Sequence, residues 1–273
     1  MPAYTGDSMA TLFSGLLIGV VVAAAAYLFF IWIVIRDRGQ VFLLLFLLCL
    51  GVNIAGSSDL LMGNIGLHDT GLRDFIATSS LILSWVFGLF FSYYFLELDT
   101  NNPAYTLPFM AIAGFLLVTL VYSLIDRASV ALVLPLLGAA TVSAILISGL
   151  SGVRNGTGGS LVHIVAFTCF LIGALARSAY VLGYIASPAN AYNATYIAYA
   201  MSALLFAIVV ANQFAARQDE KEKALAISNE RFALATRGAN EGLFDWNLAT
   251  GEIFFSDQFR RILGIRIGND PDG

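Results

Sequence analysis

Seven apolar runs dominate this chain, and each is about as long as a helix must be to cross a bilayer. A helix rises about 1.5 Å per residue, so about 20 residues span the roughly 30 Å of hydrocarbon in a membrane. The runs lie at residues 9–35, 41–65, 75–96, 106–125, 130–150, 160–186 and 193–215. The sequence therefore predicts an all-α membrane protein, folded as a seven-transmembrane helix bundle.

The composition supports a membrane location and argues against nucleic-acid binding. Hydrophobic residues make up 59% of the 273 residues and charged residues 12%, whereas soluble domains are about 45–50% apolar and about 25% charged. The net charge is −4, and no basic patch of the kind that binds nucleic acid is present. The expected partner of the apolar runs is thus the lipid bilayer, with no nucleic acid.

The orientation follows from the loops between the runs, because cytoplasmic loops are enriched in lysine and arginine. One side of the membrane has Arg73 and Arg127 only. The other side has Arg36, Arg38, Arg154, Arg217, Lys221 and Lys223. We therefore expect the N-terminus outside and, after seven spans, the C-terminal tail in the cytoplasm.

The segment that follows the seventh run reads as a helix that leaves the membrane. We take 1–215 as the membrane domain and 216–230 as a helical linker, in which charges of both signs alternate with apolar residues. Phe214, Lys221, Leu225 and Phe232 approximate the a and d spacing of a coiled coil. This spacing favours a homodimer through the linker; a solvated amphipathic tether is the alternative.

Residues 231–273 have the pattern of a small soluble domain. In GLFDWNLATGEIFFS, aromatic and β-branched residues flank a turn that contains Gly251, which predicts a β-hairpin, and DQFRRILG predicts a helix after it. The pattern contains too few strands to bury a core. We expect this segment to be the beginning of a truncated α/β domain.

The run RFALATRGANEGLFDWNLATGEIFFSDQFRRILGI resembles the start of a PAS domain of bacterial sensor proteins. The resemblance implies a cytoplasmic sensory or relay module that is followed by an output domain, either a diguanylate cyclase or phosphodiesterase of cyclic-di-GMP, or a histidine kinase. The first kind is favoured because similar segments occur in such proteins. The catalytic motifs of these enzymes are not in the sequence, so the enzymatic activity stays undecided.

The membrane part resembles the bacterial seven-transmembrane receptors with diverse intracellular signalling modules. The resemblance lies in IRDRGQVFLLLFLLCLG at 35–51 and in FFSYYFLELDTNNPAY at 90–105. It implies a multi-pass receptor of the bacterial inner membrane, with a periplasmic N-terminus, that responds to an unidentified small molecule. Many such receptors recognise their ligand in a domain before the first span, so here we expect the spans and short outer loops to do so.

Other chemistries find little support in the sequence. The first lysine is Lys221, so the seventh span offers no amine for a Schiff base with retinal. His68 and His163 fall toward opposite faces of the membrane and cannot share a metal ion. The sequence indicates no catalytic residue and identifies no cofactor.

A charged residue inside the sixth run, Arg177, marks the candidate site. Counted from the cytoplasmic ends of their spans, Arg177 lies about 26 Å and Asp59 about 28 Å along the helix. A charge is costly at these depths unless it is paired, hydrated or able to reach the interface. In one interpretation the two residues form a structural ion pair, or Arg177 reaches the outer interface alone.

In the second interpretation the same two residues line an outward-facing polar pocket that binds the stimulus. The candidate ligand-binding residues are Asn53, Asp59, Trp85, Arg177, Tyr180, Tyr184, Tyr196 and Tyr199. A receptor accounts for the spans, the linker and the soluble segment together. A transporter-like bundle is the alternative, suggested by Pro135, which we expect to break the fifth span; a passive membrane anchor would not need the polar residues.

Overall fold

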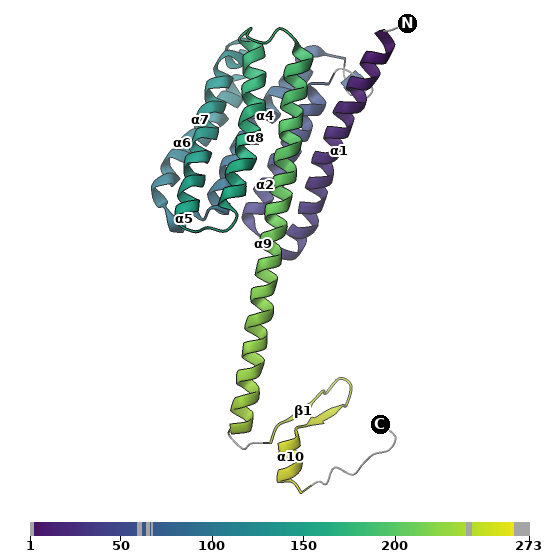
Figure 1. The fold of residues 1–273 in the computed structure, drawn as a ribbon, viewed down its shortest axis with the longest axis vertical. Coiled ribbons are helices and arrows are strands. Elements are labelled where there is room, and N and C mark those ends of the chain that lie inside the picture. Colours follow the sequence, from purple (N-terminus) through teal and green to yellow (C-terminus); the bar gives the residue numbers. More distant parts are fainter. Residues whose placement is uncertain (1–2, 59–61, 64–65, 67, 239–241, 265–273) are drawn as a thin grey trace. The chain divides into compact units, whose positions relative to one another are not determined.

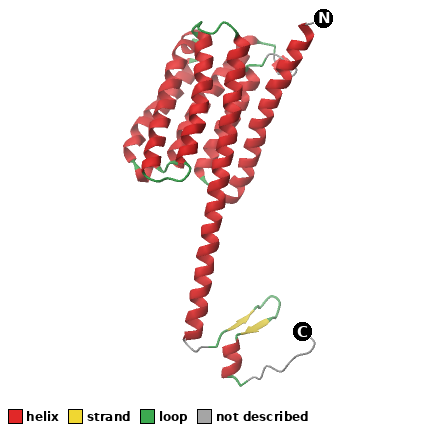
Figure 2. Cartoon of the chain, in the orientation of Figure 1, coloured by secondary structure: helices red, strands yellow, loops and turns green. Residues whose placement is uncertain are grey.

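The computed structural model describes residues 3–58, 62–63, 66, 68–238 and 242–264. The membrane part contains α1 (Ala3–Ile35), α2 (Arg38–Gly56), α4 (Thr70–Phe95), α5 (Leu98–Asn101), the 3-10 helix η1 (Pro103–Tyr105), α6 (Thr106–Tyr122), α7 (Arg127–Arg154), α8 (Ser160–Val181) and α9 (Pro188–Gly238). Seven of these helices, α1, α2, α4, α6, α7, α8 and α9, are long and apolar enough to cross a membrane (Figures 1 and 2). The predicted seven-helix bundle is thereby confirmed.

The helices pack in a compact bundle within the unit Met1–Phe214. α1 packs on α2, α2 on α4, and α4 on both α6 and α7, while α7 packs on α8 (Figure 1). Two hydrogen bonds join α9 to α8: the Thr195 hydroxyl donates to the Gly173 carbonyl at 2.9 Å, and the Ser202 hydroxyl to the Ala166 carbonyl at 2.9 Å. The last spanning helix is therefore held in the bundle by polar contacts as well as by packing.

Aromatic rings from four helices meet at the centre of the bundle. The ring of Phe206 on α9 lies 5.9 Å from Phe46 of α2, 5.2 Å from Phe91 of α4 and 5.1 Å from Phe167 of α8. All four side chains are almost fully buried. This phenylalanine cluster makes α9 a shared packing surface for α2, α4 and α8.

His163 lies inside the same cluster, surrounded by aromatic rings. The imidazole is fully buried, 4.8 Å from the Phe167 ring and stacked on Phe95 at 5.1 Å. Neither ring nitrogen has a hydrogen-bond partner among the described residues. His68 is exposed, and no group of three potential metal ligands occurs in the described part of the chain.

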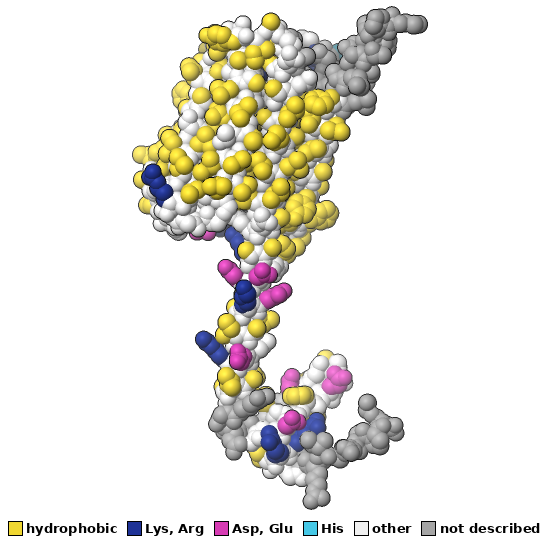
Figure 3. Space-filling view, in the orientation of Figure 1, with side chains coloured by type: hydrophobic (Ala, Val, Ile, Leu, Met, Phe, Trp, Pro, Cys, Tyr) yellow, Lys and Arg dark blue, Asp and Glu magenta, His cyan; other side chains and the backbone are white. Residues whose placement is uncertain are grey.

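The outside of the bundle is apolar, as a surface in contact with lipid must be. Figure 3 shows hydrophobic side chains over the lateral face of the helices. Large apolar residues are exposed there on five helices: Phe30, Leu107, Val118, Leu136, Leu161 and Ile208. Because water would make such a surface unfavourable, the chain is a multi-pass membrane protein.

Expectations about the second and the fifth span are wrong in detail. We expected the second span to reach residue 65, but α2 ends at Gly56, where a Cβ atom would lie 3.4 Å from the Ala77 backbone nitrogen and where the polar Ser57 caps the helix. Pro135 does not break the fifth span, because α7 continues through it. The proline only leaves the carbonyl of residue 131 without its usual N–H donor.

The second unit, Ala215–Gly273, contains the remainder of α9, a hairpin and a short helix. β1 (Phe244–Trp246) pairs antiparallel with β2 (Ile253–Phe255), with Phe244 opposite Phe255. α10 (Asp257–Ile262) follows, and the Ser256 hydroxyl accepts a hydrogen bond from the Phe259 N–H as its N-terminal cap. The hairpin and the helix after it lie where the sequence predicts them.

Candidate functional site

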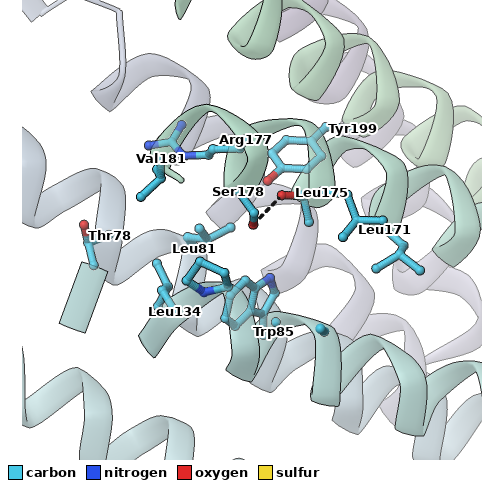
Figure 4. Close-up of a pocket in the computed structure, with 14 residues that line it drawn as sticks. Thr78, Leu81, Trp85, Leu134, Leu171, Leu175, Arg177, Ser178, Val181 and Tyr199 are labelled. Carbon is cyan, nitrogen blue, oxygen red and sulfur yellow. Dashed lines mark hydrogen bonds between the residues drawn. The ribbon is translucent and has the colours of Figure 1, made fainter. Parts of the chain in front are cut away.

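A cavity of about 120 Å³ lies among α4, α7, α8 and α9 (Figure 4). It is lined by Thr78, Leu81, Trp85, Leu134, Pro135, Gly138, Ala139, Leu171, Ala174, Leu175, Arg177, Ser178, Val181 and Tyr199. All four helices contribute these residues from within the first unit, so the cavity is a feature of the membrane bundle alone. Most of its wall is aliphatic, and the polar side chains form a small minority.

Three polar atoms of the lining are buried without a partner. The Arg177 Nη1, the Trp85 Nε1 and the Tyr199 hydroxyl have no hydrogen-bond partner among the described residues. Trp85 is 4% exposed and Tyr199 is fully buried. Leaving a buried polar group unsatisfied costs about 1–3 kcal/mol, so these three atoms mark the cavity as a candidate binding site.

The position of Trp85 is set by a glycine on the neighbouring helix. A Cβ atom at Gly138 of α7 would lie 2.6 Å from the indole Cη2, which is closer than packed atoms come. The absence of a side chain at Gly138 therefore lets the indole lie against the α7 backbone. Figure 4 shows Ser178 and Leu81 between the indole and the ring of Tyr199 in this view.

Arg177 and Tyr199 are held by aromatic neighbours. The guanidinium carbon of Arg177 lies 4.8 Å from the centre of the Tyr192 ring, a cation–π distance. The Tyr199 ring stacks on Phe170 with centroids 5.0 Å apart and planes inclined by 19°. These contacts fix the planes of both groups and leave their hydrogen-bonding atoms for a ligand or water.

The edge of the cavity reaches the lateral surface of the bundle. Leu175 and Val181 line the cavity and yet are 52% and 48% exposed. Both lie on α8, on the side of the bundle that contacts lipid. The lining thus includes side chains that face the bilayer.

The structure brings together some of the predicted site residues and separates others. Trp85, Arg177 and Tyr199 line the cavity. Tyr180 and Tyr196 are not in the lining; their ring centroids lie 6.1 and 6.0 Å from that of Tyr192, the ring that Arg177 covers.

Asn53 and Tyr184 are not in the cavity lining. The Asn53 amide donates to the Ala77 carbonyl at 2.7 Å and so joins α2 to α4. Tyr184 is 83% exposed, because α8 ends at Val181 and not at residue 186 as expected. Gly183, at φ +81°, ends the helix, and the N–H groups of Gly183 and Tyr184 bond back to Tyr180 and Ala179.

Asp59 lies outside the described residues, so its pairing with Arg177 stays a prediction. The depth predicted for Asp59 assumed that the second span is helical from its cytoplasmic end up to residue 59. Because α2 ends at Gly56, the helical rise does not give the depth of residue 59.

Several lining residues were not foreseen. Ser178 and Leu171 lie seven residues apart on α8 and so share one face of that helix, but neither has the three- or four-residue spacing from Arg177. Thr78, Leu134 and Gly138 come from α4 and α7. The sequence does not reveal which faces of those helices meet α8, so these residues could be found only in the folded chain.

Comparisons with known proteins agree with the fold. A family model described as 7TM diverse intracellular signalling matches residues 10–213, about three quarters of the chain. Neither the curated proteins nor the solved structures provided a match. The chain belongs to this family of seven-transmembrane proteins, and it is a membrane receptor of intracellular signalling.

Proposed function

We propose that the protein is a bacterial inner-membrane sensor that detects a small molecule in its helix bundle and transmits the signal through α9 to a cytoplasmic module. One observation carries this proposal. Tyr199, which lines the cavity, belongs to the same uninterrupted helix that continues to Gly238, beyond the end of the membrane part. A change at the cavity therefore has a continuous covalent and hydrogen-bonded path out of the membrane.

The distribution of basic residues supports a periplasmic N-terminus and a cytoplasmic C-terminus. Two hydrogen bonds show which loops lie at the same end of the bundle. The Asn102 amide donates to the Ser151 hydroxyl at 3.0 Å, and the Gln213 amide donates to the Gly158 carbonyl at 2.9 Å. Arg154 and Arg217 flank these contacts in sequence. By the positive-inside rule this end of the bundle faces the cytoplasm.

The cytoplasmic module is proposed to begin a PAS domain. The hairpin and α10 are consistent with this, since the Phe255 and Phe259 rings stack at 5.2 Å and Gly242 leaves room for Phe259 beside it. The output that follows is proposed to be a diguanylate cyclase or phosphodiesterase. A histidine kinase is the second possibility, and the sequence beyond Gly273 distinguishes them.

The receptor is proposed to act as a homodimer through the part of α9 that follows Phe214. Leu225 and Phe232 are 63% and 62% exposed in the single chain and lie seven residues apart, as in a coiled coil. Ile227 and Leu234 form a second row with the same spacing. With 3.6 residues per turn, the two rows are separated by roughly 200° around the helix, so one interface can bury only one of them.

Disulfide crosslinking in membranes tests this dimer. Single cysteines at Leu225 and Phe232 are expected to crosslink strongly, because their row continues the spacing of Phe214. Cysteines at Ile227 and Leu234 serve as the matched control and are expected to crosslink weakly. Equal crosslinking at all four positions, or none, would leave this part of α9 as a tether.

A further inference from the structure

We propose that the cavity around Arg177 binds an aliphatic monocarboxylate, with the carboxylate balancing the charge of Arg177 and the chain along the aliphatic wall. This inference rests on the proposed receptor function and names the chemical class of its stimulus. It derives from the charge, the hydrogen-bonding atoms, the size and the opening of the cavity.

The charge of the cavity selects a monoanion. Arg177 is the cationic residue of the lining, and no acidic residue lines the cavity in the described part of the chain. The lining therefore carries one positive charge, which a single negative charge balances. A phosphate dianion would leave one negative charge uncompensated among leucines.

The hydrogen-bonding atoms fit a carboxylate. Arg177 Nη1 and Trp85 Nε1 are donors only, and the Tyr199 hydroxyl can donate as well. A carboxylate accepts through two oxygens with about four lone-pair directions, so it suits a lining whose unpartnered atoms can all donate. An alcohol or an amine would bring hydrogens of its own, and Arg177 and Trp85 offer no acceptor for them.

The volume of the cavity limits the length of the ligand's aliphatic chain. A dry cavity of about 150 Å³ holds benzene in another protein; the 120 Å³ here would hold a molecule the size of butyrate. Leu81, Leu134 and Leu171 provide the apolar wall. Because Leu175 and Val181 of the lining are half-exposed, a longer chain would extend from the cavity toward the bilayer, so the ligand can come from the aqueous phase or from lipid.

Thermal unfolding of the full-length protein in nanodiscs tests the proposal. Butyrate and decanoate represent the aqueous and the lipid source, and butyramide and decanamide are their neutral controls. A carboxylate at about 100 times its Kd is expected to raise Tm by about 5 °C, saturably, and the amides are not. A response to butyrate alone indicates the aqueous source, and a response to decanoate alone the lipid source.

The variants separate binding at the cavity from effects elsewhere. Arg177→Met is expected to lose the Tm shift, and Trp85→Phe to weaken binding about tenfold by removing one donor. Arg127→Met is the matched control: this arginine bonds the Gly71 carbonyl and lies over Phe75, away from the cavity, so the shift is expected to persist. A shift that survives Arg177→Met would overturn the proposal.

The competing hypothesis is that the carboxylate of Asp59, and not a ligand, is the partner of Arg177. The same assay distinguishes the two. If neither the wild type nor Asp59→Asn responds to a carboxylate, the proposal is wrong. It is also wrong if only Asp59→Asn responds, because Asp59 would then be the native partner of Arg177. Neither result affects the crosslinking of α9, so the ligand class can fail while the receptor function stands.

Discussion

Gly173→Leu is expected to destabilise the helix bundle strongly, at a cost of about 3 kcal/mol. Gly173 lies at a close approach of α8 and α9, where a Cβ atom would come 2.8 Å from Ala198 Cβ and 3.2 Å from the Thr195 carbonyl oxygen. Backbone atoms cannot rotate away as a side chain can. The helices would have to separate, which would also break the bond from the Thr195 hydroxyl to the Gly173 carbonyl.

Thermal unfolding in detergent measures this loss, and Gly114→Leu is the matched control. A Cβ atom at Gly114 of α6 would meet nothing within 4 Å, and the residue is exposed on the lipid side. That variant is expected to be neutral or slightly more stable, since leucine favours helix more than glycine does. Similar losses at the two positions would contradict the close packing of α8 on α9.

Phe206→Ala is expected to cost about 3 kcal/mol, because it empties the centre of the phenylalanine cluster. Its ring contacts one phenylalanine from each of α2, α4 and α8, and it is fully buried. In a membrane the loss comes from packing, since lipid is as apolar as the protein interior. The cavity that remains would weaken the contact of α9 with all three neighbours at once.

Leu204→Ala on the same helix is the control for Phe206→Ala. Leu204 is 49% exposed toward lipid, so its truncation leaves little internal space and is expected to cost less than about 1 kcal/mol. Both variants are compared by thermal unfolding in the same detergent. A loss at Leu204 that equals the loss at Phe206 would mean that α9 is not anchored by the cluster.

The spans could be predicted because helix length and apolar composition are local properties of the sequence. Their ends were harder to predict. α2 stops at Gly56, close to Ala77 of α4 and followed by Ser57 as its cap, and hydrophobicity alone does not reveal this end. The turn after Val181 depends on the left-handed conformation of Gly183, which a long apolar run conceals.

The site illustrates the same limit. Arg177 stands out in the sequence because a guanidinium in an apolar helix requires an explanation. Trp85 and Tyr199 could be proposed as its neighbours from residue type, but the same argument also suggested Asn53 and Tyr184. Asn53 joins α2 to α4, and Tyr184 lies beyond the end of α8. Which polar residues share a cavity depends on helix rotation, and apolar helices carry little pattern that encodes it.

The distance between two spin labels at position 225, measured by pulsed EPR on the full-length protein in nanodiscs, tests most directly whether α9 carries the state of the cavity to the cytoplasm. Arg177→Met alters the cavity and the contact of Arg177 with Tyr192 while leaving the sequence of α9 unchanged, and Arg127→Met is the control at another arginine. We expect a resolved distance between the two copies that shifts in Arg177→Met and matches the wild type in Arg127→Met. An unchanged distance in Arg177→Met, or no dipolar coupling in any sample, would contradict transmission through α9.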